Sequence, residues 1–354
     1  MRIASVEVIP YALPFREPYV TAAGRLERRE MVLLRLRTED GLVGLGEAVP
    51  LSLRGGAALS RVVDELRLLA DYETLDETTL AGDAELSAPA RCAALIALLD
   101  LRGKRAAAEG KAEVAPATAV RCNATLAAGD PASVVSAAER WAADGFSTFK
   151  LKLGTGDDVA QVRAVREALG PRARIRVDAN GAWDLETAKR TLADLDPYEV
   201  ELAEQPVATL EEAMEVARWT SIPLAGDESI ESRGDAERAA AMEACQLTGV
   251  KLSKVGGPEA AIEIAEVLPT YLSSALDGPV GIAAAAQVAA TLSETAAGEG
   301  PDLAHGLATQ RLFAATIAST ECELRGDMLH APPGPGLGVE IDEEALAARR
   351  LDTP

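Results

Sequence analysis

The chain has 354 residues and a formal net charge of −21 at pH 7, and aromatic residues make up only 3% of it. This length suffices for a (β/α) barrel with a smaller second domain, and the composition predicts an aliphatic core. The acidic balance excludes the basic face that nucleic acid or an anionic membrane requires, so neither is expected as a partner. No apolar run approaches the roughly 20 residues of a membrane span, and residues 1–10 lack the apolar segment of a signal peptide. We therefore expect a cytoplasmic protein.

Cysteine and histidine usage narrows the chemistry further. The four cysteines are widely spaced with no Cys-x-x-Cys pair, which predicts buried thiols and argues against a disulfide framework or a zinc site. His305 and His330 are the only two histidines. A site built on several histidines, as in metal-dependent aldolases, is therefore not expected.

Residues 1–50 have the pattern of an antiparallel sheet, with strands predicted at Ile3–Tyr11, Met31–Thr38 and Leu42–Ala48. Two stretches around this sheet are small and polar: residues 21–25 and residues 51–56. Both are typical of loops that move over a bound ligand, although ordinary surface turns have the same composition. We predict substrate-binding residues on these two loops, Thr21 and Arg54.

Helical periodicity follows at 57–71 and 88–109 and lapses between Gly110 and Pro116. We place the first domain boundary there, with residues 1–115 on its N-terminal side.

From residue 116 the pattern alternates between short apolar runs and helical segments. Strands are predicted at 119–126, 149–153, 175–178, 200–204, 222–227, 250–253 and 272–276, with a last run at 302–307. Helices are predicted at 131–144, 157–169, 185–195, 210–219, 234–244 and 281–292. A repeat of about 25 residues holding one strand and one helix predicts a parallel barrel over 116–320. The tail, 321–354, contains a Pro- and Gly-rich stretch at 331–338 and is expected to run back to the N-terminal domain.

Five charged side chains recur at one phase of this repeat: Lys152, Asp178, Glu204, Asp227 and Lys251. Each lies on or at the end of a predicted strand. Because functional groups of a parallel barrel gather at the C-terminal ends of its strands, we expect these five to meet at one mouth.

Three of the five are carboxylates on consecutive units. Taken singly, Asp178 reads as a turn residue, Asp227 as a helix N-cap and Glu204 as a surface charge. Their common phase favours a shared role, since independent turn and cap residues have no reason to fall at the same point of a repeat. Hard oxygen ligands of this kind suit Mg²⁺, with Mn²⁺ as the alternative.

The lysines suggest the chemistry around such an ion. Lys150 and Lys152 are two apart on a strand and so point to the same face, toward the barrel interior. Lys251 enters from the opposite side of the ring, whereas Lys254 is assigned to the other face and to a structural role. Two lysines across a divalent metal indicate proton abstraction next to a carboxylate, with a lysine whose pKa is lowered by its charged neighbours as the base.

These motifs resemble the muconate lactonizing enzyme subgroup of the enolase superfamily. The similar segments are Gly44-Leu45-Gly46-Glu47-Ala48, Lys150-Leu151-Lys152, Val177-Asp178-Ala179-Asn180, Ala203-Glu204-Gln205-Pro206, Gly226-Asp227-Glu228-Ser229, Val250-Lys251 with Gly256-Gly257, and Pro335-Gly336-Leu337-Gly338. The resemblance implies an α/β fold: a modified (β/α)₇β TIM-like barrel under an N-terminal α+β capping domain that the C-terminal tail completes. It implies Mg²⁺ on Asp178, Glu204 and Asp227, an acid/base pair of Lys152 and Lys251, and Lys150 holding the substrate carboxylate.

The subgroup contains several activities that share one proton-abstraction step. Segments 273–277, 280–283 and 305–309 resemble o-succinylbenzoate synthases of menaquinone biosynthesis, in which Ser273 and Ser274 would bind the succinyl end of the substrate. N-succinylamino acid racemase, dipeptide epimerase and muconate cycloisomerase are the alternatives. The region before the last strand has only Asp302 in place of the Asp-x-Asp of dipeptide epimerases, which disfavours that reading.

A non-catalytic barrel that only binds metal is the competing class, and the presence of all five charged residues argues against it. We expect a small-molecule carboxylate as the partner. The sequence leaves open whether the chain forms a homo-oligomer.

Overall fold

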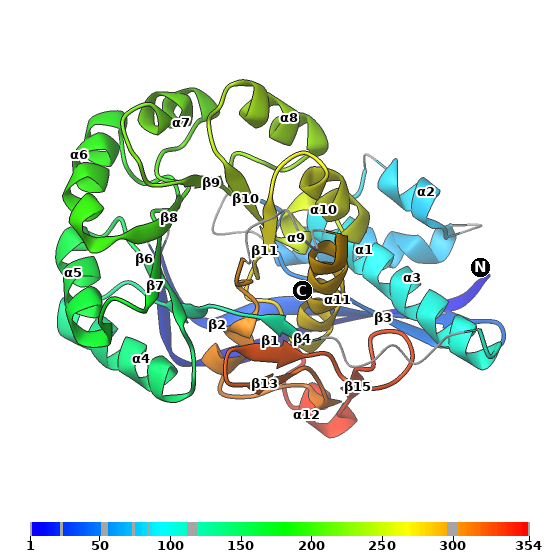
Figure 1. Ribbon diagram of the computed structural model, residues 1–354. Coiled ribbons are helices and arrows are strands. Elements are labelled where there is room, and N and C mark those ends of the chain that lie inside the picture. The colour runs from blue at the N-terminus through cyan, green and yellow to red at the C-terminus, as the bar shows by residue number, and fades with distance from the viewer. Residues whose placement is uncertain are drawn as a thin grey trace.

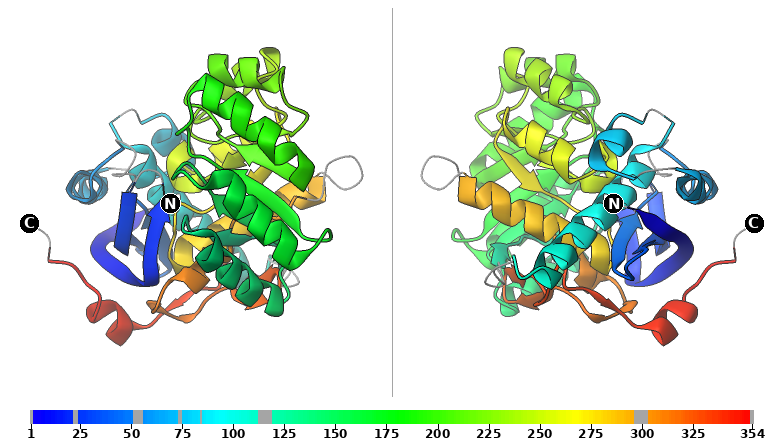
Figure 2. Two further views of the ribbon diagram at one scale, coloured as in Figure 1. Left: turned by 90° about the vertical axis from the view of Figure 1, so that its left-hand side faces the viewer. Right: turned by 90° about the vertical axis from the view of Figure 1, so that its right-hand side faces the viewer.

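The computed structural model describes residues 2–21, 24–50, 56–72, 75–83, 85–111, 119–295 and 303–352. A curled parallel sheet with helices on its outside forms one part of the molecule, and an antiparallel sheet with three helices lies against it (Figure 1). The two side views show the N-terminal strands packed along one side of the barrel (Figure 2). In the described part of the chain no helix is both long and apolar enough to span a membrane.

The N-terminal sheet has the order β1-β2-β3, with β1 at Ile3–Thr21, β2 at Gly24–Thr38 and β3 at Val43–Ala48. Its pairing is antiparallel, as predicted. The first two strands form a much longer hairpin than expected, because residues 21, 24 and 25 belong to strands. Residues 22 and 23, the rest of that predicted loop, lie outside the described residues, and so do residues 51–55 with Arg54.

Strand β2 is buried on both faces, and alternation sends its side chains to two cores. Met31 and Leu33 belong to the core shared with the barrel, whereas Val32 and Leu34 pack with the helices of the N-terminal domain. Those helices are α1 at Leu59–Leu68, α2 at Glu77–Ala81 and α3 at Ala88–Ala108, with a short 3₁₀ turn, η2, at Leu69–Asp71. The sheet therefore serves as the wall between cap and barrel.

The barrel sheet has the order β11-β10-β9-β8-β7-β6-β5, and every described pairing in it is parallel. Its strands are β5 Ala124–Leu126, β6 Thr148–Lys152, β7 Arg174–Asp178, β8 Val200–Glu204, β9 Leu224–Gly226, β10 Leu247–Val250 and β11 Thr270–Leu272. Its helices are α4 Pro131–Ala143, α5 Asp158–Leu169, α6 Leu185–Leu195, α7 Leu210–Ala217, α8 Arg233–Ala241, α9 Leu252–Val255, α10 Pro258–Ala265 and α11 Pro279–Thr295, with η3 at Asp196–Tyr198 and η4 at Ala308–Leu312.

A short eighth segment closes the ring. His305 forms a parallel bridge with Cys122, and Gly306 forms one with Ser273. The backbone amide of Gly306 donates to Leu272 O at 2.7 Å, and that of Asn123 donates to His305 O at 2.8 Å. Seven strands plus this segment confirm the predicted α/β barrel with an N-terminal antiparallel cap.

Three predicted strands are wrong in part. The run at 119–126 is divided into β4 (Ala119–Arg121) and β5, which belong to different sheets, and β11 ends at Leu272 where a strand over 272–276 was expected. Residues 250–253 were expected to be extended, but β10 ends at Val250 and residues 252–255 form the helical turn α9. The turn stops at Gly256, whose φ of +95° glycine adopts readily. The sequence Val250-Lys251-Leu252-Ser253 is too short to show either period, so the pattern does not decide between a strand and a helical turn.

The C-terminal tail contacts both parts of the molecule. Strand β14 (Met328–His330) pairs antiparallel with β13 (Glu323–Arg325) on one side and with β4 (Ala119–Arg121) on the other. Strand β12 (Ala318–Thr320) pairs with β15 (Glu340–Ile341). After α12 (Glu343–Ala347) the chain runs beside β1, where the Ala12 amide donates to Arg349 O at 3.0 Å and the Leu351 amide donates to Pro10 O at 2.9 Å. The domain boundaries at 115/116 and 320/321 stay predictions. Residues 112–118, around the first of them, lie outside the described ranges.

Candidate active site

The barrel interior brings the predicted charged residues together. Lys152, Asp178 and Glu204 end three neighbouring strands and are in register with one another. Asp227 follows β9 directly and Lys251 follows β10. All five residues are buried, with exposed fractions between 0% for Asp178 and 7% for Lys251. Period-two alternation explains the arrangement, because residues two apart on β6 share the inward face.

Ion pairs link these side chains. Lys150 Nζ lies 2.8 Å from Asp178 Oδ2 and 2.5 Å from Glu204 Oε2. Lys152 Nζ lies 2.5 Å from the same Asp178 oxygen, and Lys251 Nζ donates to Asp227 Oδ2. The two lysines of β6 therefore contact one carboxylate, and Lys251 contacts the carboxylate two units further round the ring.

Lys254 belongs to this cluster, contrary to its predicted structural role on the opposite face. Its ammonium donates to Asp227 Oδ1 at 2.9 Å and to the backbone oxygen of Ile230 at 2.9 Å. The reason is the helical turn α9: strand alternation does not apply there, and residues three apart lie on one side of a helix. The three-residue spacing from Lys251 was the available sequence signal.

Burial and the neighbouring charges shift the pKa values of the two lysines of β6, Lys150 and Lys152, in opposite directions. Burial, together with the cations of Lys150 and Lys251, lowers the pKa of Lys152 to about 8, against the opposing effect of Asp178. Burial also acts to lower the pKa of Lys150, but Asp178 and Glu204 outweigh it and raise that pKa above its usual range. Of the two lysines of β6, Lys152 therefore has the pKa nearer to neutral pH.

The three carboxylates that were predicted to hold a metal lie among ammonium groups. Across the described residues, no three acidic, histidine or cysteine side chains form a metal site as they are placed. Ammonium groups lie between the carboxylates and supply the compensating charge. The donor chemistry nevertheless fits a hard divalent cation: Asp178, Glu204 and Asp227 are three fully buried carboxylates, and Glu204 Oε1 is buried without a hydrogen-bond partner among the described atoms. The assignment of Mg²⁺ to them stays a prediction.

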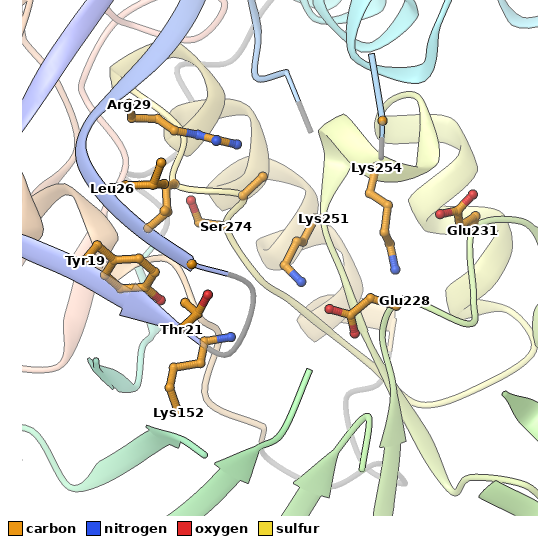
Figure 3. Close-up of a pocket in the computed structure, with 14 residues that line it drawn as sticks. Tyr19, Thr21, Leu26, Arg29, Lys152, Glu228, Glu231, Lys251, Lys254 and Ser274 are labelled. Atoms are coloured by element: carbon orange, nitrogen blue, oxygen red, sulfur yellow. The ribbon is translucent and has the colours of Figure 1, made fainter. Parts of the chain in front are cut away.

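A cavity of about 260 Å³ opens beside Lys152 and Lys251. Lys152 and Lys251 point into it from the barrel, and Tyr19, Leu26 and Arg29 face it from the capping hairpin (Figure 3). Ala275 and Leu276, in the loop after β11, add apolar surface. A substrate in this cavity would have a lysine on each side of it and the cap above.

The structure places the predicted substrate-binding residues Thr21, Ser273 and Ser274 differently with respect to the cavity. Thr21 and Ser274 line the cavity, whereas Ser273 is not among its described lining residues. The Ser274 hydroxyl donates to Asp277 Oδ2 at 2.7 Å and accepts from the Asp277 amide at 2.8 Å, so it is engaged within its own loop.

The turns after Asp178 and Glu204 carry two residues, Asn180 and Gln205, to which the sequence motifs assigned no role of their own. Asn180 and Gln205 have φ values of +51° and +38°, in a region that non-glycine residues rarely occupy. Asn180 Oδ1 accepts from Lys152 Nζ at 3.0 Å, and its side-chain Nδ2 donates to Glu228 Oε1 at 3.1 Å. Gln205 Oε1 accepts from the Asp227 amide at 2.8 Å. Unusual backbone conformations of this kind concentrate at functional sites, where the surrounding contacts hold them in place.

A TIM-like barrel under an antiparallel cap, with lysines and carboxylates on successive strand ends, is the architecture of the enolase-superfamily enzymes. Residues 3–109 match the family described as mandelate racemase / muconate lactonizing enzyme, N-terminal domain, and residues 133–345 match the one described as enolase C-terminal domain-like. The chain belongs to this mandelate racemase / muconate lactonizing enzyme family of the enolase superfamily.

Three relatives show the range of activities around it. The chain is 40% identical over 242 residues to an o-succinylbenzoate synthase of Thermobifida fusca, an alignment that covers 66% of this chain and 71% of the relative. A muconate lactonizing enzyme from Pseudomonas fluorescens, solved with muconolactone, superposes with a TM-score of 0.89 at 29% identity over 99% of both chains. A dipeptide epimerase from Enterococcus faecalis, solved with Mg and L-Leu-L-Tyr, gives 0.86 at 26% identity over 96% of this chain and 100% of that one.

Proposed function

We propose that the protein is an o-succinylbenzoate synthase, which removes water from a cyclohexadiene carboxylate bearing a succinyl chain. The observation that carries the proposal is its 40% identity over 242 residues, 66% of this chain, to the Thermobifida fusca synthase. The lactonizing enzyme and the epimerase align with 99% and 96% of this chain, at 29% and 26% identity. The apolar wall formed by Leu26, Ala275 and Leu276 is consistent with a carbocyclic substrate.

The geometry supports a two-step elimination on one face of the substrate. Neutral Lys152 takes the proton α to the carboxylate, and the C–H electron pair moves into the carboxylate to give an enediolate. The C–O bond to the β-hydroxyl then breaks, and the leaving oxygen takes the proton back from Lys152, so that water departs and the ring becomes aromatic. Lys251, on the opposite side of the cavity, stabilises the negative charge as a cation.

The divalent ion would be held by Asp178, Glu204 and Asp227. When bound, it supplies positive charge to the carboxylate oxygens on which negative charge accumulates. Lys150, which contacts two of these three side chains, would hold and polarise the substrate carboxylate.

Dipeptide epimerase is the second candidate, and one feature of the cavity favours it. Glu228 and Glu231 line the cavity together with the lysines. Their carboxylates provide a place for the ammonium group of a dipeptide, which the proposed succinyl substrate lacks.

The two candidates differ in a measurable product. The enzyme is incubated in D₂O with the succinyl cyclohexadiene carboxylate, with an N-succinylamino acid and with an L,L-dipeptide. A synthase forms an aromatic chromophore and water, whereas a racemase or epimerase incorporates deuterium at the α-carbon. Turnover of the dipeptide alone would replace the synthase by the epimerase, and inertness toward all three would refute both.

Variants of the two lysines test the catalytic assignment. Lys152→Ala and Lys251→Ala should each lower turnover by about 10²–10⁴-fold, the usual contribution of a positioned acid or base. Lys189→Ala is the matched control, because Lys189 lies on the outer helix α6 against the ring of Trp219. Full activity in both active-site variants would remove the proposed mechanism.

A further inference from the structure

A tyrosine beneath the predicted metal ligands contacts one of them directly. Tyr271 is on β11, its side chain is fully buried, and its hydroxyl donates to Glu204 Oε2. No sequence motif marks this residue, since a tyrosine in a short apolar run reads as core.

We propose that Tyr271 is a positioning residue for the divalent ion: it fixes the rotation of the Glu204 carboxylate so that one oxygen stays available as a ligand. The proposal rests on the metal assignment made under the proposed function. It concerns a residue that touches neither substrate nor ion and acts only through Glu204.

The hydrogen bonds of Glu204 carry the argument. Its Oε2 accepts from Tyr271 and also lies 2.5 Å from Lys150 Nζ. Its Oε1 is buried and has no hydrogen-bond partner among the described atoms. Two donors from different strands on one oxygen define the plane of the carboxylate, because rotation about the last side-chain torsion would break both bonds. An unpartnered buried carboxylate oxygen is costly unless a ligand completes it.

The tyrosine ring is itself held from two sides. The guanidinium carbon of Arg176, on β7, lies 5.2 Å from the ring centroid. Arg176 is fixed in turn by a 2.5 Å bond to Glu201 Oε2 and a 2.6 Å bond to Ala304 O. On β10, a Cβ placed on Gly249 would lie 2.8 Å from the Tyr271 hydroxyl, so the close approach requires glycine. Three strands thus fix where the hydroxyl points.

The plain alternative is that Tyr271 only fills the bottom of the barrel. It does pack with Leu202, Ala225 and Leu247. Removal of the hydroxyl alone separates the two roles, because phenylalanine keeps the ring and therefore the packing. Groups that orient metal ligands typically cost 10- to 100-fold in metal affinity or activity when they are removed.

The test compares two tyrosine-to-phenylalanine variants. Tyr271→Phe removes the bond to Glu204, and Tyr11→Phe removes an equivalent buried tyrosine–glutamate bond of 2.8 Å to Glu47, away from the carboxylate cluster. Mg²⁺ affinity is measured by titration calorimetry, with Mn²⁺ as a second probe. We expect Tyr271→Phe to bind the ion at least about tenfold more weakly, with Tyr11→Phe unchanged.

Turnover as a function of Mg²⁺ concentration provides a second readout. Tyr271→Phe should need more Mg²⁺ but recover most of its turnover at saturation, which a general loss of packing would not allow. Gly249→Ala, which crowds the hydroxyl while keeping it, should weaken Mg²⁺ binding in the same direction.

Equal Mg²⁺ affinities for wild type and Tyr271→Phe would overturn this inference and leave the proposed function intact. Wild-type protein that binds neither ion would instead refute the metal assignment itself. The two failures are therefore distinguishable.

Discussion

Glu47 links the capping domain to the barrel, and its protonation should make the stability of the protein depend on pH. Its carboxylate is 1% exposed. It accepts from the Tyr11 hydroxyl at 2.8 Å and from the backbone amides of Gly278 at 2.6 Å and Val280 at 3.3 Å, at the start of α11. Burial, together with the nearby charge of Asp277, raises its pKa from 4.5 to about 8. The perturbation that isolates this group is Glu47→Gln, which keeps the shape and removes the titration.

The sign of the effect follows from proton binding. Between the two pKa values the unfolded chain has released the proton of Glu47 and the folded chain has kept it. Stability must therefore fall as pH rises through this range, and the contribution of Glu47 is fully present only below the unfolded pKa. Each pKa unit corresponds to about 1.4 kcal/mol, so a shift from 4.5 to about 8 amounts to roughly 5 kcal/mol over the whole window. Because the group is buried, solvent screening does not reduce this figure.

Urea unfolding of wild type and Glu47→Gln at pH 5, 6, 7 and 8 measures the effect. When the unfolding free energies of the two proteins are subtracted at each pH, the contributions of the groups that both proteins share cancel. Wild type should lose stability relative to the variant by up to about 1.4 kcal/mol per pH unit. A difference that stays constant from pH 5 to pH 8 would refute the reasoning, and would mean that the helix amides keep Glu47 ionised in the folded protein.

Two further predictions concern the same junction and the metal. Gly278→Ala places a Cβ 2.4 Å from the Tyr11 hydroxyl and 2.8 Å from Glu47 Oε2, and should destabilise the protein by about 1–3 kcal/mol in urea unfolding. Gly234→Ala in α8, where the nearest such atom is 3.8 Å away, is the control and should not destabilise; equal losses in both would contradict the contact. Chelation should abolish turnover, and Mg²⁺ at about 100 times its Kd should raise the unfolding free energy by about 2.7 kcal/mol; activity that survives exhaustive chelation would contradict the metal assignment.

The positions of Lys152, Asp178 and Glu204 at neighbouring strand ends were predictable because strand alternation and repeat length act together. Asp178 and Glu204 end strands that begin or end within a residue of their predicted limits. Helix α6 was predicted at its observed bounds, since it begins after Asp184, whose side chain caps the amide of Thr187. Where local capping and periodicity agree, the sequence pattern defines the element.

Prediction failed where one pattern was compatible with two structures. The run at 250–253 is a strand end followed by a helical turn, and this shift alone moves Lys254 into the site. The approach of Tyr271 to Glu204 joins residues 67 positions apart and depends on the curvature of the sheet. The contact of Tyr271 leaves no local signal, because it is set by how strands pack across the barrel.

Residues of both the cap and the barrel line the cavity. The barrel provides the lysines, whereas the cap provides Tyr19, Leu26 and Arg29. The loop after β11 stands between them: Leu276 lines the cavity with a φ of +68°, a conformation that an isolated leucine would avoid. That conformation is held by bonds within the loop and, two residues on, by Glu47 of the cap. The part of the cavity wall formed by Leu276 thus depends on the contact between the cap and this loop. Substitutions at the junction should therefore alter the Michaelis constant more than the proton-abstraction step, because the bonds described for Lys152 and Lys251 are to the barrel residues Asp178, Asn180 and Asp227.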